Sequence, residues 1–169
     1  MNHGSSAADA SDENHWLQKG WIEHTQVLLD SYFHWIGRDL IPRTGSALDQ
    51  AIALYFAPFV VVSHGTAPDP VLNYGNQAAL TLWEMPVETF LKTPSRLTAE
   101  PMHRDERAQL LERTTRNGYV DDYQGIRISS SGRRFRIDQA TVWNLIDADG
   151  DRVGQAATFS LWRYLESDS

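Results

Sequence analysis

The sequence of 169 residues contains no cysteine. Without a thiol, the chain can form no disulfide, no thiolate metal site and no cysteine nucleophile. It has no uninterrupted apolar run of the roughly 18–20 residues that a membrane helix needs, and residues 1–14 are too polar for a signal or transit peptide. Positive charge is scarce as well, since 15 Lys and Arg face 22 Asp and Glu, for a net charge of −7. We therefore expect a cytoplasmic domain with neither a membrane nor a nucleic acid among its partners.

What the chain does contain is the composition of one folded domain. Hydrophobic residues make up 41 % and charged residues 22 %, which is too apolar for a disordered protein. A length of 169 residues fits a single domain with an extension. The sequence pattern predicts a disordered tail over residues 1–14, a helical extension over 15–57 and a folded domain over 58–165.

The clearest secondary-structure signal is a helix over residues 15–41. Its apolar side chains share one side of the helix and its polar side chains share the other. The residue before Pro42 avoids the α conformation, which ends the helix. Ser46 then caps a second helix that is expected to run to Phe56.

The apolar arc of the first helix is wider than we expect one sheet face to cover. From Leu17 to Phe33 it spans about 160° by helical periodicity, whereas a surface helix needs a stripe of about 100°. Because a two-fold interface pairs identical patches, a second copy of the chain is the simplest cover. We predict a homodimer with an interface that contains Trp21, Leu28, Tyr32, Phe33, Trp35 and Ile36. The alternatives are a helix that folds wholly onto its own domain, or one that is held for a different protein.

From residue 58 onward the pattern is that of an α+β domain. Strands are expected over residues 59–64, 71–72, 119–129, 133–146 and 152–164, and helices over 76–83, 86–91 and 101–117. The last three strands are joined by sequences with hairpin turn chemistry, at 130–132 and 147–150. The simplest closure is a five-stranded antiparallel sheet with helices on one face, preceded by the amphipathic N-terminal helix.

Several stretches resemble a known family. NQAALTLW, which begins at Asn76, is similar to the asparagine-led helix of PAS domains, and residues 118–159 resemble the three closing PAS strands. More narrowly, APFVVVSHG, NYGNQAAL, PSRLTAEP, LLERTTRNG and SGRRFRI resemble the MEKHLA family, PAS-like modules of small bacterial proteins and of plant class III homeodomain–zipper transcription factors. The resemblance covers residues 48–165 and extends to the preceding helix, and it implies a sensory or protein-interaction module. Glu84 departs from the PAS pattern, in which glycine often follows the asparagine-led helix.

Candidate metal and cofactor motifs are weak. The absence of cysteine removes the flavin–cysteinyl chemistry of LOV modules. His103 stands near the position of the haem-ligating histidine of haem-binding PAS domains, but its charged neighbours indicate the solvated first turn of a helix. Asp147, Asp149 and Asp151 resemble the start of a calcium loop but lack its glycine and its terminal glutamate, so a hairpin turn is expected.

Candidate catalytic and nucleic-acid motifs are no stronger. Ser63 and His64 cannot form a nucleophile–base pair, because adjacent side chains of a strand point to opposite faces. With no catalytic constellation in the sequence, we expect no enzymatic activity. Four arginines surround the hairpin at residues 130–132: Arg127, Arg133, Arg134 and Arg136. Because Arg134 and Arg136 alternate with apolar residues, we interpret this group as the solvated side of the sheet, with ion pairs to nearby aspartates.

Glutamines on the closing strands are the least ordinary feature. The apolar alternation directs Gln124, Gln139 and Gln155 toward the expected core, one from each strand. One interpretation is a small pocket in which they orient a polar ligand; its candidate residues are Gln124, Gln139, Gln155, Trp83, Trp143 and Asn76. The alternative is that the amides reach water or bind backbone groups, since a buried unpaired amide costs about 1–3 kcal/mol.

Two hypotheses about function follow from the sequence. In the first, the domain is a sensor in which a bound ligand or cofactor changes the N-terminal helix. In the second, it is an unliganded homodimerisation module with no small-molecule input. The sequence names neither the ligand or cofactor nor the signal.

Overall fold

The computed structural model describes residues 14–166. The disordered tail predicted for residues 1–14 therefore lies outside the described residues, apart from Asn14. The N-terminal extension contains η1 (His15–Leu17), α2 (Lys19–Ile36) and α3 (Ala47–Tyr55). Helix α2 ends earlier than predicted because Gly37 takes a left-handed φ of 84°, which closes the helix before Pro42.

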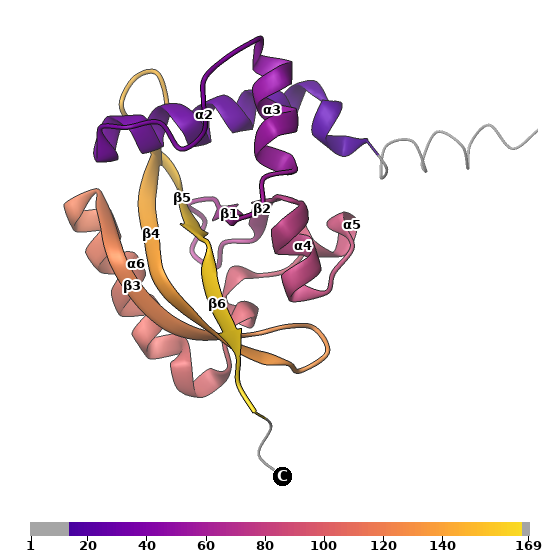
Figure 1. The fold of residues 1–169 in the computed structure, drawn as a ribbon. Coiled ribbons are helices and arrows are strands. Elements are labelled where there is room, and N and C mark those ends of the chain that lie inside the picture. Colours follow the sequence, from indigo (N-terminus) through magenta and orange to yellow (C-terminus); the bar gives the residue numbers. More distant parts are fainter. Residues whose placement is uncertain (1–13, 167–169) are drawn as a thin grey trace, which may run out of the picture.

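In the rest of the chain, two strands are followed by a run of helices and then by four consecutive strands (Figure 1). In chain order the elements are β1 (Val60–His64), β2 (Leu72–Gly75), α4 (Gln77–Trp83), α5 (Val87–Phe90), η2 (Ser95–Thr98), η3 (Pro101–His103), α6 (Arg104–Asn117), β3 (Tyr119–Ile128), β4 (Arg134–Ile146), β5 (Arg152–Phe159) and β6 (Leu161–Tyr164). Among the described residues, no helix is both long and apolar enough to span a membrane.

The strands form one antiparallel sheet in the order β2-β1-β5-β4-β3. This arrangement confirms the predicted α+β fold, but the sheet has six strands rather than five. The strand predicted over residues 152–164 breaks at Ser160 into two parts with different neighbours. Strand β5 runs between β1 and β4, whereas β6 pairs with residues 135–138 of β4.

The two faces of the sheet carry separate cores. Val61 and Trp143 pack with residues of α2 and α3, whereas their chain neighbours Val60 and Val142 pack with residues of α4, α5 and α6. Because successive side chains of a strand point to opposite faces, these cores lie on opposite sides of the sheet. We call them the α2 face and the α6 face. In Figure 1, α2 crosses near one end of β4, and α6 runs alongside β3.

A bulge in β4 reverses the side-chain alternation that the sequence predicts for this strand. Gln139 has a positive φ of 51° and lies where β4 has one residue more than the paired segment of β3. Before the bulge, Phe135 and Ile137 face α6 as predicted. After it, Trp143 and Leu145 face α2, so the inward direction predicted for Trp143 is wrong.

The orientation predicted for β3 is also wrong. Tyr123 and Arg127 are buried, whereas Ile126 is half-buried and Gln124 is exposed. Arg127 pairs with Phe135 of β4, and directly opposed residues of an antiparallel pair share a face. The pairing with β4, rather than the apolar character of Ile126, therefore decides which side chains of β3 point inward.

The turn after α4 is built without the glycine of the PAS pattern. Glu84 takes a left-handed φ of 58°. Its carboxylate accepts a hydrogen bond of 2.6 Å from the Ser129 hydroxyl and another from Ser131, and its carbonyl accepts one of 2.7 Å from the Ser130 hydroxyl. The serine hairpin between β3 and β4 thus holds a backbone conformation that would otherwise favour glycine.

Candidate functional site

A cavity of about 70 Å³ lies between the sheet and the helices of the α6 face. Strands β1 to β5 form one wall, and α4, α5, η2 and α6 form the other. The lining is mostly apolar but includes two arginines; it consists of Val62, His64, Leu72, Trp83, Phe90, Ser95, Thr98, Arg107, Leu110, Leu111, Tyr123, Arg127, Ile137, Ala140, Val142, Gln155, Ala156, Ala157 and Phe159.

Arg127 of β3 enters the cavity from the sheet. Only 8 % of its surface is exposed. Its guanidinium donates to the Ile126 carbonyl at 2.9 Å and to the Tyr123 hydroxyl at 3.0 Å, and it lies 5.5 Å from the centre of the Tyr123 ring. Among the described residues, no carboxylate forms an ion pair with Arg127. The interpretation of this arginine as part of a solvated face is therefore wrong.

Arg107 reaches the same cavity from α6. Its guanidinium donates to the hydroxyl of Ser95, which is itself buried. Burial lowers the pKa of Arg107 to about 10, and the positive charge of Arg127 adds to this shift. The shift is opposed by Tyr123 and by Asp69, whose carboxylate is paired with Arg96 at 3.1 Å. With this pKa, Arg107 remains charged at neutral pH, and its guanidinium shares the cavity with that of Arg127.

Gln155 of β5 connects the cavity with α2 through Asn144. Its amide nitrogen lies 3.0 Å from the Leu111 carbonyl, 2.9 Å from the Thr115 hydroxyl and 3.0 Å from the Asn144 amide oxygen. The carbonyl of Asn144 accepts a hydrogen bond of 2.9 Å from the Trp35 indole of α2. The side chain of Asn144 therefore contacts Gln155 at the cavity wall, and the backbone carbonyl of the same residue contacts Trp35 on the opposite face of the sheet.

The structure places the candidate ligand residues in three different environments. Gln155 and Trp83 line the cavity, and the Trp83 indole N–H has no hydrogen-bond partner within residues 14–166. Gln124 and Gln139 are exposed, and Gln124 accepts a hydrogen bond from Arg136. Trp143 is fully buried but packs against Tyr32 on the α2 face. Of the three glutamines, only Gln155 has the predicted inward position.

Asn76, the remaining candidate, is committed to the backbone. Its side-chain oxygen accepts hydrogen bonds from the amides of Val61 and Ala79, at 3.1 and 3.2 Å. Its nitrogen donates to the carbonyls of Leu54 and Phe59, at 3.2 and 2.8 Å. It does not line the cavity. Asn76 therefore caps α4 and ties this helix to β1 and to the end of α3.

Ser63 and His64 point to opposite faces of β1, as predicted. His64 lines the cavity, while Ser63 meets His24 of α2, with 2.9 Å between the Ser63 hydroxyl oxygen and Nε2 of His24. Burial lowers the pKa of His24 to about 4. Burial also lowers the pKa of His64, although the bond from Nδ1 to the Gly65 carbonyl opposes this effect. Both imidazoles are neutral at pH 7.

Most of the predicted dimer interface is occupied within one protomer. Trp21, Leu28 and Tyr32 are buried in the core of the α2 face, and Trp35 and Ile36 are partly buried against it. Only Phe33 is exposed, at 50 %. The expectation that one sheet face leaves this arc uncovered is wrong, because α3 packs on α2 beside the sheet.

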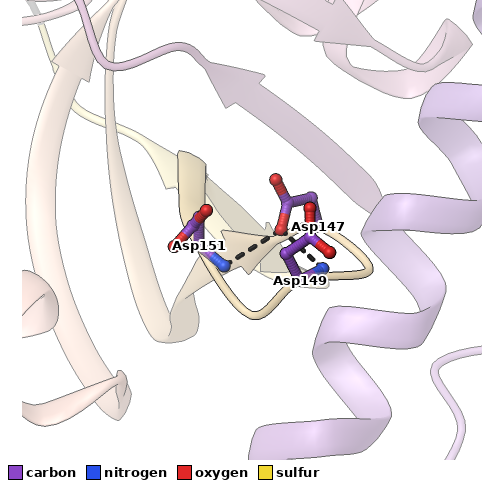
Figure 2. A group of neighbouring side chains, drawn as sticks. All are labelled: Asp147, Asp149 and Asp151. Atoms are coloured by element: carbon purple, nitrogen blue, oxygen red, sulfur yellow. Dashed lines mark hydrogen bonds between the residues drawn. The ribbon is translucent and has the colours of Figure 1, made fainter.

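The three aspartates of the last hairpin form a turn. One carboxylate oxygen of Asp147 accepts hydrogen bonds from the backbone amides of Asp149 and Asp151, at 2.9 and 3.0 Å (Figure 2). All three side chains are exposed, and their carboxylates lie within 4.8 Å of one another. This arrangement agrees with the hairpin turn expected from the sequence.

The cavity does not fit the large cofactors found in some PAS domains. An apolar cavity of about 150 Å³ holds one benzene molecule, and this cavity has a volume of only about 70 Å³. A flavin or a haem therefore does not fit. His103, the candidate haem ligand, does not line the cavity.

Sequence reasoning misses the two arginines for different reasons. Arg127 is flanked by Ile126 and Ile128, whose apolar character predicts the opposite orientation of β3, whereas Arg107 has polar and charged neighbours. Arg107 lies in a run that includes Arg104, Asp105 and Glu106, which reads as a solvated helix end. One signal was available: Leu110 and Leu111 form the apolar part of α6, and Arg107 precedes them by three and four residues, which places it on their side of the helix.

Comparisons with known proteins agree with this fold. The PAS domain of a protein from Colwellia psychrerythraea superposes with a TM-score of 0.58 at 13 % identity, over 69 % of this chain and 94 % of that chain. A Light-Oxygen-Voltage domain studied with a flavin analogue gives a TM-score of 0.54 at 19 % identity, over 70 % of this chain and 85 % of that chain. Identities this low establish the PAS-like fold alone.

Sequence comparison identifies the family. Homeobox-leucine zipper protein ATHB-9 of Arabidopsis thaliana is 24 % identical over 150 residues, which are 89 % of this chain and 17 % of the relative's length. The chain therefore spans only a small part of that protein. The sequence model of the MEKHLA domain matches residues 22–164, from α2 through β6. The chain belongs to the MEKHLA family, and its structure is that of a PAS-like domain.

Proposed function

We propose that this MEKHLA domain is a sensory module that binds a small ligand in the cavity of the α6 face. The observation that carries the proposal is the lining of that cavity. Charged and hydrogen-bonding groups from α6, β3 and β5, among them Arg107, Arg127 and Gln155, meet on otherwise apolar walls. Ligand sites combine apolar walls and a few placed polar groups in this way.

The output of the proposed sensor is a change at α2. A ligand that displaces or rotates the Gln155 amide alters its contact with Asn144, whose carbonyl accepts the bond from Trp35. Because that carbonyl belongs to the strand between the two faces, a small shift of β4 changes the contact with α2. The proposal needs only two arrangements of this path with different affinities for the ligand.

The alternative, a homodimerisation module without a ligand, has less support. It would rest on Phe33 and on the exposed parts of Trp35 and Ile36, since the other predicted interface residues are used within the protomer. We propose no catalytic activity. Ser63 is only 1 % exposed, and its hydroxyl lies against His24 of α2, on the face opposite the cavity. We also propose that the domain acts in the cytoplasm.

The test is a screen of small neutral, cationic and anionic compounds by thermal shift, with native mass spectrometry of the purified protein. Ala140 lines the cavity, so Ala140→Val fills part of it, whereas Thr141→Val on the same strand is a matched change outside it. A compound that raises the Tm of the wild type and of Thr141→Val, but not of Ala140→Val, supports the proposal. If no compound of any charge behaves in this way and no bound mass is found, the sensor is excluded.

A further inference from the structure

The charge of the cavity lining is unbalanced. Arg107 and Arg127 both line the cavity, and neither forms an ion pair with a described carboxylate. The hydrogen bonds that they donate go to neutral groups: the Ser95 and Tyr123 hydroxyls and the Ile126 carbonyl. His64, which also faces the cavity, is neutral at pH 7 and supplies no negative charge.

Two like charges in one small cavity are costly. A buried charge is normally paired, because transfer from water into an apolar environment disfavours the charged form. Arg127 is 8 % exposed, and the repulsion between its charge and that of Arg107 adds to the effect of burial, which is the main cause of the lowered pKa of Arg107. An anion between the two guanidinium groups would replace this repulsion by charge-assisted hydrogen bonds.

The volume of the cavity and its apolar lining restrict which anions can bind there. One water needs about 10–15 Å³ of such volume and one benzene occupies a cavity of about 150 Å³, so a cavity of about 70 Å³ accommodates a ligand of roughly three to five non-hydrogen atoms. Trp83, Phe90 and Leu110 in the lining offer aromatic and aliphatic surface. That surface suits an alkyl group better than further oxygen atoms.

We propose that the cavity binds a small monocarboxylate with a short apolar tail, held through its carboxylate by Arg107 and Arg127. This inference rests on the proposed function and names its ligand class. Guanidinium groups match the planar carboxylate in two-bond geometry. The Ser95 hydroxyl lies beside Arg107 and can add a hydrogen bond at the same end of the ligand. The Tyr123 hydroxyl, which accepts from Arg127 and donates to the Glu106 carboxylate at 3.5 Å, holds the Arg127 guanidinium in place. The tail then packs against the apolar lining.

The test uses calorimetric titration of the full chain with propionate, its neutral analogue propionamide and inorganic phosphate. We expect binding of propionate and none of propionamide or phosphate. Arg107→Gln and Arg127→Gln should each weaken propionate binding about 10- to 100-fold, the loss of one charge-assisted contact. Arg113→Gln, an exposed arginine of the same helix, is the matched control and should bind as the wild type does.

Each outcome decides the matter. If propionamide binds as strongly as propionate, the cavity does not recognise a carboxylate. The same conclusion follows if both arginine variants bind propionate as tightly as the wild type does. Binding of phosphate without propionate overturns the apolar tail. Should either variant fail to fold, the comparison of propionate with propionamide on the wild type still decides. A neutral or cationic compound that passes the Ala140→Val screen while propionate fails leaves the sensor intact and overturns this inference alone.

Discussion

The two faces of one sheet are built from different chemistry. On the α2 face, Leu28 and Trp143 have no exposed surface, and the Trp143 ring meets Tyr32 edge-on at 5.1 Å. On the α6 face, the same strands line a cavity that contains two arginines, neither of which forms an ion pair with a carboxylate of the described residues. Strand β4 contributes to both, with Trp143 on one side and Val142 on the other.

We infer from this difference that the α2 face mainly stabilises the domain and that the α6 face is the one suited to bind a ligand. A close-packed aromatic face leaves no room for a ligand and transmits small movements, because packed interiors compress little. In the proposed sensor, a cavity whose arginines pair with no described carboxylate gives up stability for the capacity to bind a ligand. The connection of the two faces through Gln155, Asn144 and Trp35 gives binding on one face a means to change contacts on the other.

The largest expected effect tests the packing of the α2 face. Leu28→Ala removes a fully buried side chain from this core and should lower the free energy of unfolding by about 2–5 kcal/mol. Phe33→Ala, on the same helix but 50 % exposed, should cost less than about 1 kcal/mol. Urea unfolding measures both. Equal losses would contradict the packing of α2 onto its own sheet.

The next effect concerns pH. The pKa of His24 is lowered to about 4 in the folded protein, whereas an unfolded histidine has a pKa of about 6.5. Below pH 6.5 the unfolded state therefore binds a proton that the folded state does not. The free energy of unfolding should fall by up to about 3 kcal/mol as the pH drops from 6.5 to 4. His64, whose pKa is also lowered, adds to the same trend.

Substitution of His24 measures how much this residue contributes to the pH dependence of the free energy of unfolding. His24→Gln keeps a hydrogen-bonding group near Ser63 but cannot titrate, so urea unfolding at pH 7 and about pH 4.5 should show a smaller acid loss than in the wild type. His34→Gln, at an exposed position of the same helix, is the control. In this variant the free energy of unfolding should fall between pH 7 and about pH 4.5 by as much as in the wild type. Identical pH dependence in His24→Gln and the wild type would show that His24 is not buried as described.

The smallest effect tests the contact between the faces. Trp35→Phe removes the bond of 2.9 Å to the Asn144 carbonyl and should cost about 1 kcal/mol of stability. Propionate should still bind, because Trp35 does not line the cavity. Thermal melts with and without propionate measure both quantities. Loss of propionate binding in this variant would show that the two faces are not separable.

Local signals in the sequence predicted the caps and turns well. Ser46 caps α3: its side-chain oxygen accepts a hydrogen bond from the Asp49 amide, and the Asp49 carboxylate accepts one from the Ser46 amide. Asp147 closes the last hairpin through its own neighbours. These features depend on residues within four positions of one another, so the sequence determines them without knowledge of the sheet.

The site was harder to predict because sheet pairing decides it. A single extra residue at Gln139 moved Trp143 to the other face, and the pairing of Arg127 with Phe135 turned a charged side chain inward. Gln155 was placed correctly, since no such irregularity separates it from the apolar residues Ala157 and Phe159. Alternation along a strand predicts direction only until the first bulge.

The most direct test of the account follows the indole N–H signal of Trp35 by NMR in protein with ¹⁵N-labelled tryptophan, while propionate is added. The signal reports the bond to the Asn144 carbonyl, on the opposite face from the cavity. The account predicts that it shifts with the same midpoint as propionate binding. Gln155→Leu should retain cooperative unfolding but lose this shift. Saturated binding of propionate with no change in the Trp35 signal would contradict a sensor that acts through α2.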